Sequence, residues 1–189
     1  QTMNPSTEDI LNAAGEVNAE TIFVLPNNKN IILAAEQAMH MIEDKRIIVV
    51  PSTTVPQGIT ALINFMPDLS AEENLDNMKA EMQRVKTGQI TYAVRTTNID
   101  GMDINEGDIM AIGDHGMLAV EQDVPDAALK ALDKLIDEES ELVSLYYGAE
   151  VSEEEANELL EQAKERFPQV EVELQNGGQP VYYYLLSVE

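Results

Sequence analysis

The sequence contains no cysteine and few basic residues. Without cysteine the chain has neither disulfide bonds nor thiolate metal ligands, and this favours a cytoplasmic protein. Lysine and arginine number 11 against 35 aspartates and glutamates, so the formal net charge is −24. Such a surface repels nucleic-acid phosphates and anionic lipid, whereas it attracts a basic partner protein. Solubility alone is the competing explanation of this charge.

Long apolar runs are absent as well. The runs at residues 22–25 and 47–50 are far shorter than the roughly 20 residues that cross a bilayer, so membrane insertion is not expected. No signal-peptide pattern stands at the start. The chain also lacks a Gly-rich phosphate loop and the protein-kinase signatures. Of the 189 residues, 44% are hydrophobic and 24% charged, which is typical of a globular protein.

The first third of the chain alternates between helix and strand patterns. Helices are predicted from about Ser6, over 30–42 and over 56–66, and Ser6 with Asp9 forms a capping-box pattern. Between them, two apolar segments at residues 21–25 and 47–50 end at prolines, as buried parallel strands do. Two strand–loop–helix units in series predict a parallel sheet with right-handed crossovers.

The remaining two thirds predict a connecting helix and a second lobe. An amphipathic helix over 70–87 starts with the capping box Ser70–Glu73 and separates a first lobe, 1–69, from a second, 88–189. The second lobe is predicted to hold strands at 90–95, 142–147, 170–174 and 181–188 and a hairpin at 108–113 and 117–121. It is also predicted to hold a helix over 125–137 and another that starts with the capping box Ser152–Glu155. The predicted fold class is therefore α/β, with a parallel-sheet βα first lobe and a mixed-sheet α+β second lobe. Four methionines are expected to fill the core, namely Met39, Met41, Met78 and Met82.

Three polar loops each precede a predicted helix, at residues 2–7, 26–30 and 51–58. Loops that follow parallel strands gather at the carboxyl edge of the sheet, so these helix starts are expected to converge there. They would present free N–H groups to an anion or to a partner's carboxylate. Ordinary helix capping is the alternative explanation of each loop. The candidate binding residues are Asn4, Ser6, Thr7, Asn27, Asn28, Asn30, Ser52, Thr53, Thr54, Gln57 and Gly58.

Other chemistry-bearing residues do not form a recognisable site. The acidic segment 100–108, with Asp114 beyond it, does not have the ligand spacing of an EF-hand, and turn chemistry explains its Asp-Gly and Glu-Gly steps. His40 and His115 have no nucleophile or carboxylate relay beside them in the sequence. No catalytic residue and no metal ligand is therefore assigned.

Four segments together resemble a known family. They are residues 1–7, 25–30, 55–58 and 176–184, which read QTMNPST, LPNNKN, VPQG and NGGQPVYYY. These motifs, in this order, resemble the C-terminal region of the dihydroxyacetone-kinase-like protein that serves as the large, ATP-binding subunit of bacterial fatty-acid kinase. The resemblance spans essentially the whole chain.

The resemblance implies a function for this region. In that family an N-terminal kinase domain binds ATP and magnesium, a middle domain follows, and the C-terminal domain recruits a DegV-type carrier protein. The carrier presents the carboxylate of its bound fatty acid for phosphorylation. The C-terminal domain itself is similar to the DegV and dihydroxyacetone-kinase fold, with two α/β lobes.

A chain that starts at Gln1 is expected to lack the kinase and middle domains. It would then be a non-catalytic docking domain without a cofactor of its own, and its partners would be the carrier and the kinase domain of the same parent chain. A homodimer is left open. The alternative is a domain that binds a triose, a lipid or a phosphate at the same sheet edge, with or without phosphatase activity. A purely structural dimerisation domain is a third option.

Overall fold

The computed structural model describes residues 4–99 and 101–189, and the chain divides into two compact units, residues 1–85 and 86–189. Residues 1–3, at the start of the first polar loop, and Asp100 of the acidic segment lie outside the described residues. In the described part of the chain, no helix has the length and apolar character that a membrane span requires.

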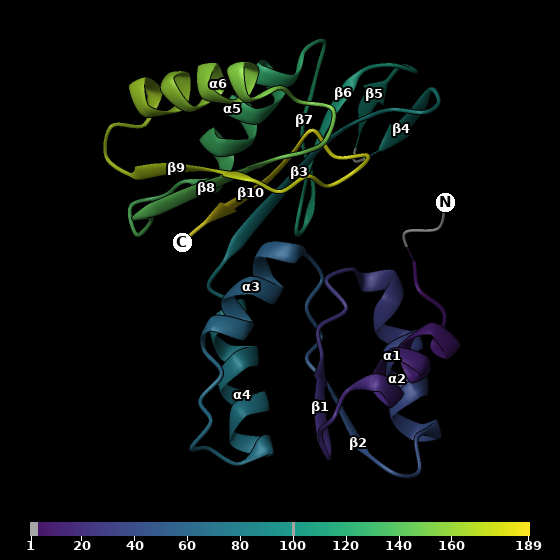
Figure 1. Cartoon of the computed structure of the whole chain (residues 1–189). Helices are drawn as coiled ribbons and strands as arrows, with labels where there is room; N and C mark the ends of the chain where they lie inside the picture. Colours follow the sequence, from purple (N-terminus) through teal and green to yellow (C-terminus); the bar gives the residue numbers. More distant parts are fainter. Residues whose placement is uncertain (1–3, 100) are drawn as a thin grey trace. The chain divides into compact units, whose positions relative to one another are not determined.

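The first unit is a small parallel sheet between two pairs of helices. Strands β1 and β2 pair in parallel, with Ile22 opposite Ile47, which confirms the predicted parallel sheet. Helices α1 and α2 lie on one face of the sheet and α3 and α4 on the other (Figure 1). The elements are α1 (Thr7–Glu16), β1 (Thr21–Val24), α2 (Lys29–Met41), β2 (Arg46–Val49), α3 (Val55–Ile63) and α4 (Ala71–Met82).

Both faces of this sheet are buried, because successive strand side chains point to opposite sides and helices cover each side. Ile22 and Ile47 pack with Ala35 of α2 in one cluster, whereas the neighbouring Phe23 packs with Met78 of α4 in another. Because side chains on both faces are buried, the strands appear in the sequence as uninterrupted apolar runs.

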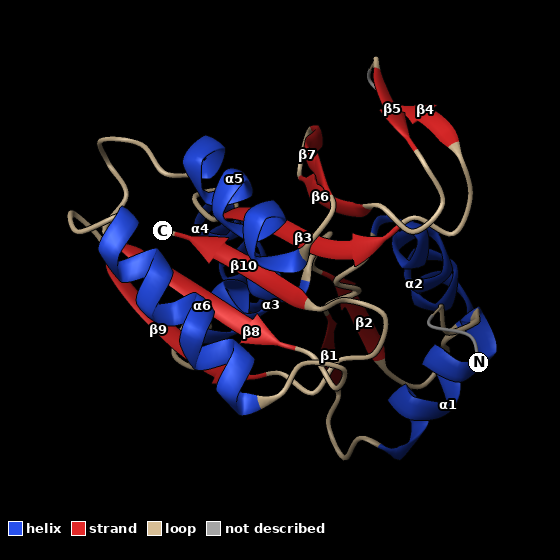
Figure 2. Cartoon of the chain, turned by 90° about the horizontal axis from the view of Figure 1, so that it is seen from above, coloured by secondary structure: helices blue, strands red, loops and turns tan. Residues whose placement is uncertain are grey.

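The second unit is a six-stranded mixed sheet in the order β7-β6-β3-β10-β8-β9. Its pairs are antiparallel except β8 with β9. Helices α5 and α6 cover one face of it (Figures 1 and 2), and a separate hairpin is formed by β4 and β5. The elements are β3 (Lys86–Tyr92), β4 (Thr97–Ile99), β5 (Met102–Ile104), β6 (Ile109–Gly113), β7 (Gly116–Glu121), α5 (Val124–Leu135), β8 (Leu142–Tyr147), α6 (Glu153–Arg166), β9 (Glu171–Asn176) and β10 (Tyr184–Val188).

The structure differs from the predicted pattern around residues 70–87. Helix α4 ends at Met82 and belongs to the first unit, and strand β3 already begins at Lys86. Thr87 and Gly88, which look like a helix stop, lie inside this strand. A Cβ on Gly88 would meet side-chain atoms of Leu135 and Leu186 at 3.2 Å. The glycine therefore allows β3 to pack closely against α5 and β10, and it does not end a helix.

Three smaller expectations also change. Met41 is 61% exposed, whereas Met78 and Met82 are buried as predicted and Met39 is partly buried. Strand β10 begins at Tyr184 rather than near Val181, whose φ of 73° interrupts the extended chain. The hairpin of β4 and β5 within 97–104 was not predicted, because its strands have only three residues each.

Capping boxes start α1, α4 and α6, as predicted. In α6 the Ser152 hydroxyl accepts a hydrogen bond from the Glu155 N–H at 3.2 Å. The Glu155 carboxylate accepts from the Ser152 N–H at 2.9 Å and from its hydroxyl at 2.6 Å. These bonds lower the pKa of the Glu155 carboxyl, so the ionised form is favoured in the folded chain.

This lowered pKa predicts how the Ser152 cap depends on pH. The unfolded pKa of a glutamate is about 4.3 and the folded one is lower, so the ionic part of the cap is present above about pH 4.3 and is lost below it. The free energy of unfolding of Ser152→Ala should therefore fall below that of the wild type by about 1 kcal/mol at pH 7. This difference should shrink as the pH falls from 5 to 3. Urea unfolding of both chains at each pH measures it, and a difference that grows toward acid would contradict the assignment.

Candidate functional site

The second and third polar loops meet beyond the ends of β1 and β2. The Asn27 N–H donates to the Ser52 hydroxyl at 3.1 Å, and that hydroxyl donates to the Asn27 side-chain oxygen at 2.7 Å. Ser52 is fully buried, and Asn27 has a left-handed backbone with a φ of 55°. Asparagine tolerates this conformation better than most residues, so a reciprocal bridge fastens the two loops together.

The remaining groups of these loops cap the helices that follow. The Thr53 N–H and hydroxyl both donate to the side-chain oxygen of Gln57, at 2.9 and 2.8 Å. Thr54 is the N-cap of α3 and accepts from the Gln57 N–H. Asn28 caps α2 by accepting from the Asn30 N–H at 2.9 Å. These polar groups, which make the loops conspicuous in the sequence, are thus engaged in hydrogen bonds within the loops and the helix starts that follow.

The first polar loop does not join them. The Thr7 hydroxyl donates to the side-chain oxygen of Gln37 at 3.0 Å, and Gln37 lies eight residues into α2. At 1.5 Å per residue, the start of α1 is beside a point about 12 Å along α2 from its first residue. The prediction of three converging helix starts therefore holds for two of them. Asn4 and Ser6, which precede α1, are exposed.

Gly58 allows the two loops to approach α3. A Cβ built on this residue would lie 1.9 Å from the side-chain oxygen of Asn27, the atom that accepts the Ser52 bond. Glycine is required here by the contact and not by its backbone angle, since its φ is not positive. Asn27, Ser52 and Gly58 form one interlocked group. A binding role for the eleven candidate residues stays a prediction.

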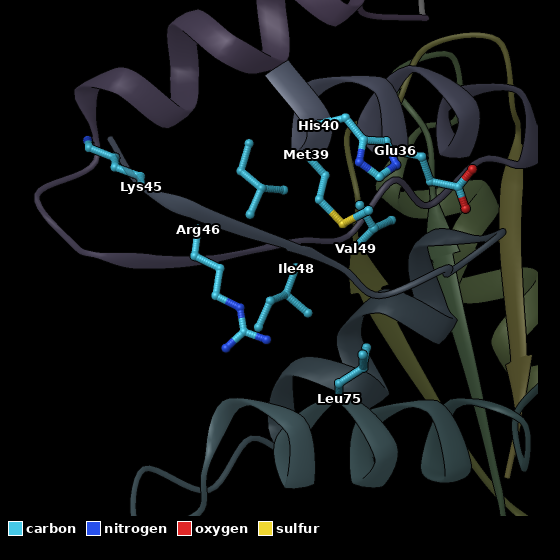
Figure 3. Close-up of a pocket in the computed structure, with 9 residues that line it drawn as sticks. Glu36, Met39, His40, Lys45, Arg46, Ile48, Val49 and Leu75 are labelled. Carbon is cyan, nitrogen blue, oxygen red and sulfur yellow. The ribbon is translucent and has the colours of Figure 1, made fainter. Parts of the chain in front are cut away.

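A groove of about 580 Å³ runs along β2 (Figure 3). Glu36, Met39 and His40 of α2 line it on one side and Leu75 of α4 on the other, with residues 45–49 between them. In the described residues β2 pairs only with β1, so its second edge carries backbone groups without a strand partner. Edges of this kind can pair with an extended segment.

The cations beside this groove are already engaged. The Lys45 ammonium donates to the carbonyls of Ala14, Gly15 and Val17 at the end of α1. The Arg46 guanidinium forms an ion pair with Glu72 at 2.6 Å. Sequence inspection missed the groove, although a sheet of two strands must have a free edge on each side.

An apolar surface lies where α3 passes into α4. We call it the apolar turn, and it consists of Leu62, Ile63, Phe65, Met66 and Leu69, which are 62%, 75%, 38%, 54% and 36% exposed. Isolated exposed apolar side chains are common, but these five fall within residues 62–69, and large exposed apolar patches are typical of interaction surfaces. The sequence prediction missed this surface, because it placed residues 64–66 inside a helix, whereas α3 ends at Ile63.

Two side-chain amides of α4 fix the backbone of this turn. Asn74 is 1% exposed, and its side-chain oxygen accepts from the Met66 N–H at 2.8 Å. Its amide nitrogen donates to the carbonyls of Met66, Leu69 and Ser70. Asn77 adds a bond to the Asn64 carbonyl at 2.6 Å. The exposed apolar side chains therefore stand on a backbone that is held in one conformation.

The acidic segment and the histidines contribute no reactive cluster in the described part of the chain. Asp108 accepts from the Asn105 N–H and from the Gln122 amide, which lower the pKa of its carboxyl and close the turn before β6. Within residues 4–99 and 101–189, no three acidic or histidine side chains are grouped to hold a metal ion. Over the same residues, neither histidine hydrogen-bonds to a hydroxyl or a carboxylate.

Comparison with known sequences gives matches over the whole chain. The family model that matches residues 1–189 describes the C-terminal region of proteins like FakA, a subunit of fatty acid kinase. Protein YloV of Bacillus subtilis strain 168 is 47% identical over 189 residues, which cover 100% of this chain and 34% of the relative. An uncharacterized protein of Staphylococcus haemolyticus is 38% identical, with the same coverage. The chain thus spans about one third of the length of these relatives.

Comparison with solved structures shows the fold. The Fak B3 protein of Streptococcus pneumoniae loaded with linoleic acid superposes with a TM-score of 0.65 at 17% identity, over 98% of this chain and 76% of that one. The dihydroxyacetone kinase of C. freundii gives 0.60 at 15% identity, over 97% and 41%. The predicted DegV and dihydroxyacetone-kinase-like α/β fold is confirmed.

The interlock of Gly58 with Asn27 predicts an unequal response of two helical glycines. Gly58→Ala should lower the free energy of unfolding by about 1–3 kcal/mol, because the new Cβ displaces the Asn27 side chain from Ser52. Gly15→Ala is the matched control. Nothing lies within 4 Å of that Cβ in α1, so the change should be neutral or stabilise by up to about 1 kcal/mol.

A double-mutant cycle with Asn27→Gly isolates this contact, since glycine keeps the left-handed backbone. In the Asn27→Gly background the cost of Gly58→Ala should largely vanish. Chemical unfolding of the four chains gives the coupling energy, and additive effects would show that the clash lies elsewhere.

Proposed function

The chain belongs to the FakA-like C-terminal family of fatty acid kinase, and we propose that it is the docking domain on which a DegV-type fatty-acid carrier protein sits. The longer relatives carry about two thirds of their length outside the matched region. In this proposal that remainder includes the domain that binds ATP and magnesium and phosphorylates the fatty-acid carboxylate. The present domain supplies recognition and no reacting group.

The observation that carries the proposal is the apolar turn on an acidic surface. Aromatic, methionine and aliphatic side chains in its centre, with Asp68, Glu72 and Glu73 beside them, have the composition of an interface core and its polar rim. A net charge of −24 would steer a carrier with a basic face toward this surface.

The fixed backbone of the turn supports the same conclusion. A buried asparagine with four hydrogen bonds to the loop holds these side chains in place before a partner arrives. Pre-organisation of this kind lowers the entropy that is lost on binding. A turn that served only to join two helices would not need apolar side chains on its outer face.

A binding experiment tests this function. We expect a DegV-type carrier loaded with fatty acid to bind the chain, with weaker binding as salt is added. Ile63→Ser and Met66→Ser should each weaken binding by roughly tenfold or more, because exposed apolar anchors at an interface contribute at this level. Calorimetry or surface plasmon resonance gives the dissociation constants.

The control is Leu33→Ser. Leu33 is 64% exposed on α2, on the other face of the small sheet, and its replacement should leave carrier binding unchanged. The lack of any binding at about 100 µM carrier and low salt would refute the proposal, since standard-size interfaces reach micromolar affinity or better. Turnover of ATP by the purified chain would refute the assignment of a purely recognising role.

Asn74 offers a separate test of the pre-organised turn. Asn74→Ala leaves buried backbone groups of the turn without partners and should lower the free energy of unfolding by about 1–3 kcal/mol. Carrier binding should also weaken at temperatures where circular dichroism shows the variant folded. Asn157→Ala is the matched control, since exposed Asn157 bonds only to Glu153 of its own helix, and its effect should stay within about 0.5 kcal/mol. Full carrier affinity in a destabilised Asn74→Ala chain would show that the amide does not prepare the surface.

A further inference from the structure

The second unit contains a pocket of about 260 Å³ that plays no part in the surface described above. Its walls come from the start of α5, the segment before α6, the first three turns of α6 and strand β10. The volume is slightly below the roughly 300–1,000 Å³ of pockets that hold drug-sized ligands. It suits one large side chain better than a cofactor.

Helix α6 places the acidic residues of this pocket by its periodicity. Glu155, Glu158 and Gln162 recur at spacings of three and four, so they line one face, and Leu159 between them is buried beneath. Glu150 completes the rim from the segment that precedes the helix. Three carboxylates and no basic side chain line the pocket.

The floor holds a tyrosine whose hydroxyl has no hydrogen-bond partner among the described residues. Tyr184 is 2% exposed and lines the pocket, yet its phenol makes no hydrogen bond to the described residues. Buried tyrosine hydroxyls usually find one. Burial, with the Glu155 charge as a second cause, raises the pKa of Tyr184 to about 12. The phenol therefore stays protonated near neutral pH, and its oxygen is available to a donor that enters the pocket.

The neighbouring groups favour a cation. The pKa of the Glu155 carboxyl is held low by the Ser152 cap, so this carboxylate is charged at neutral pH, and one of its oxygens is used in the cap while the other is not. Tyr183 adds an aromatic ring, and burial followed by the charge of Glu150 raises the pKa of its phenol. Carboxylates around aromatic rings attract a planar cation through charge and through the ring face.

We propose that this pocket receives an arginine side chain of the partner protein that docks on the chain. The proposal rests on the docking function above and adds a second, polar point of recognition. Arginine fits better than lysine, because its planar guanidinium presents five donors in a fixed fork that can bond carboxylates and the Tyr184 oxygen while it lies against Tyr183. An anionic group would meet the repulsion of three carboxylates.

A pair of small probes tests the pocket without any partner. N-acetyl-arginine methylamide and its citrulline counterpart have nearly the same shape, but only arginine is charged. In an NMR titration of the whole chain, the arginine probe should shift amide signals of Glu150, Glu158 and Tyr183 with saturation in the millimolar range, and the citrulline probe should not. Shifts spread evenly over the acidic surface, or equal shifts from both probes, would overturn the proposal.

Variants extend the test to the docking partner. Glu158→Gln and Tyr184→Phe preserve size, and each should weaken binding of the arginine probe and of the DegV-type carrier by about threefold to fivefold, as expected for the loss of one charged contact or one hydrogen bond. Glu154→Gln on the same helix, outside the pocket lining, is the matched control and should change neither. Carrier binding that is normal in the wild type and in both pocket variants would refute the pocket while leaving docking intact. Absent carrier binding by the wild type would instead refute docking, and the probe titration would still decide the pocket.

Discussion

A surplus of negative charge is the constraint that the fold has to accommodate, with 35 acidic side chains against 11 basic ones. In the capping boxes of α1, α4 and α6, carboxylates accept hydrogen bonds from backbone N–H groups at the helix N-termini. Several lysines instead meet backbone carbonyls, as Lys45 does at the end of α1 and Lys86 at the end of α5. These placements stabilise the charges locally, and the carboxylates left over form an acidic exterior that is suited to a basic partner.

Local patterns predicted much of this fold because the forces behind them are local. Capping boxes and the hairpin at 109–121 form between residues close in the sequence, and the apolar runs of β1 and β2, each followed by a proline, can be recognised from their own residues. The end of α4 could not be found in this way, because Gly88 is selected by side chains from Leu135 and Leu186, which are distant in the sequence. The apolar turn had a visible sign, since Leu62, Ile63, Phe65 and Met66 are too many for one buried helical face.

The same distinction explains the candidate site. Loops that follow β1 and β2 met as expected, because parallel strands bring their ends to one edge. In the part of the chain that the structure describes, α1 does not follow a strand, so the sheet does not position its first residue. It is placed by packing along α2, where Thr7 reaches Gln37. The pocket beside Tyr184 was not predictable either, since its walls come from α5, α6 and β10, and no local pattern reports their proximity.

Hydrogen bonding at the loops weighs against the alternative of a small-molecule site there. An anion site at helix starts needs N–H groups and hydroxyls that are free to bind the ligand. The Asn27 N–H is bonded to Ser52, and both donors of Thr53 are bonded to Gln57. A ligand would have to break these bonds, and each buried group that it failed to replace would cost about 1–3 kcal/mol. At the apolar turn, by contrast, apolar side chains are exposed, and in the Tyr184 pocket the phenol makes no hydrogen bond to the described residues. In the proposed function, recognition of a protein surface would use these groups, whereas capture of a small anion would require the loop hydrogen bonds to break.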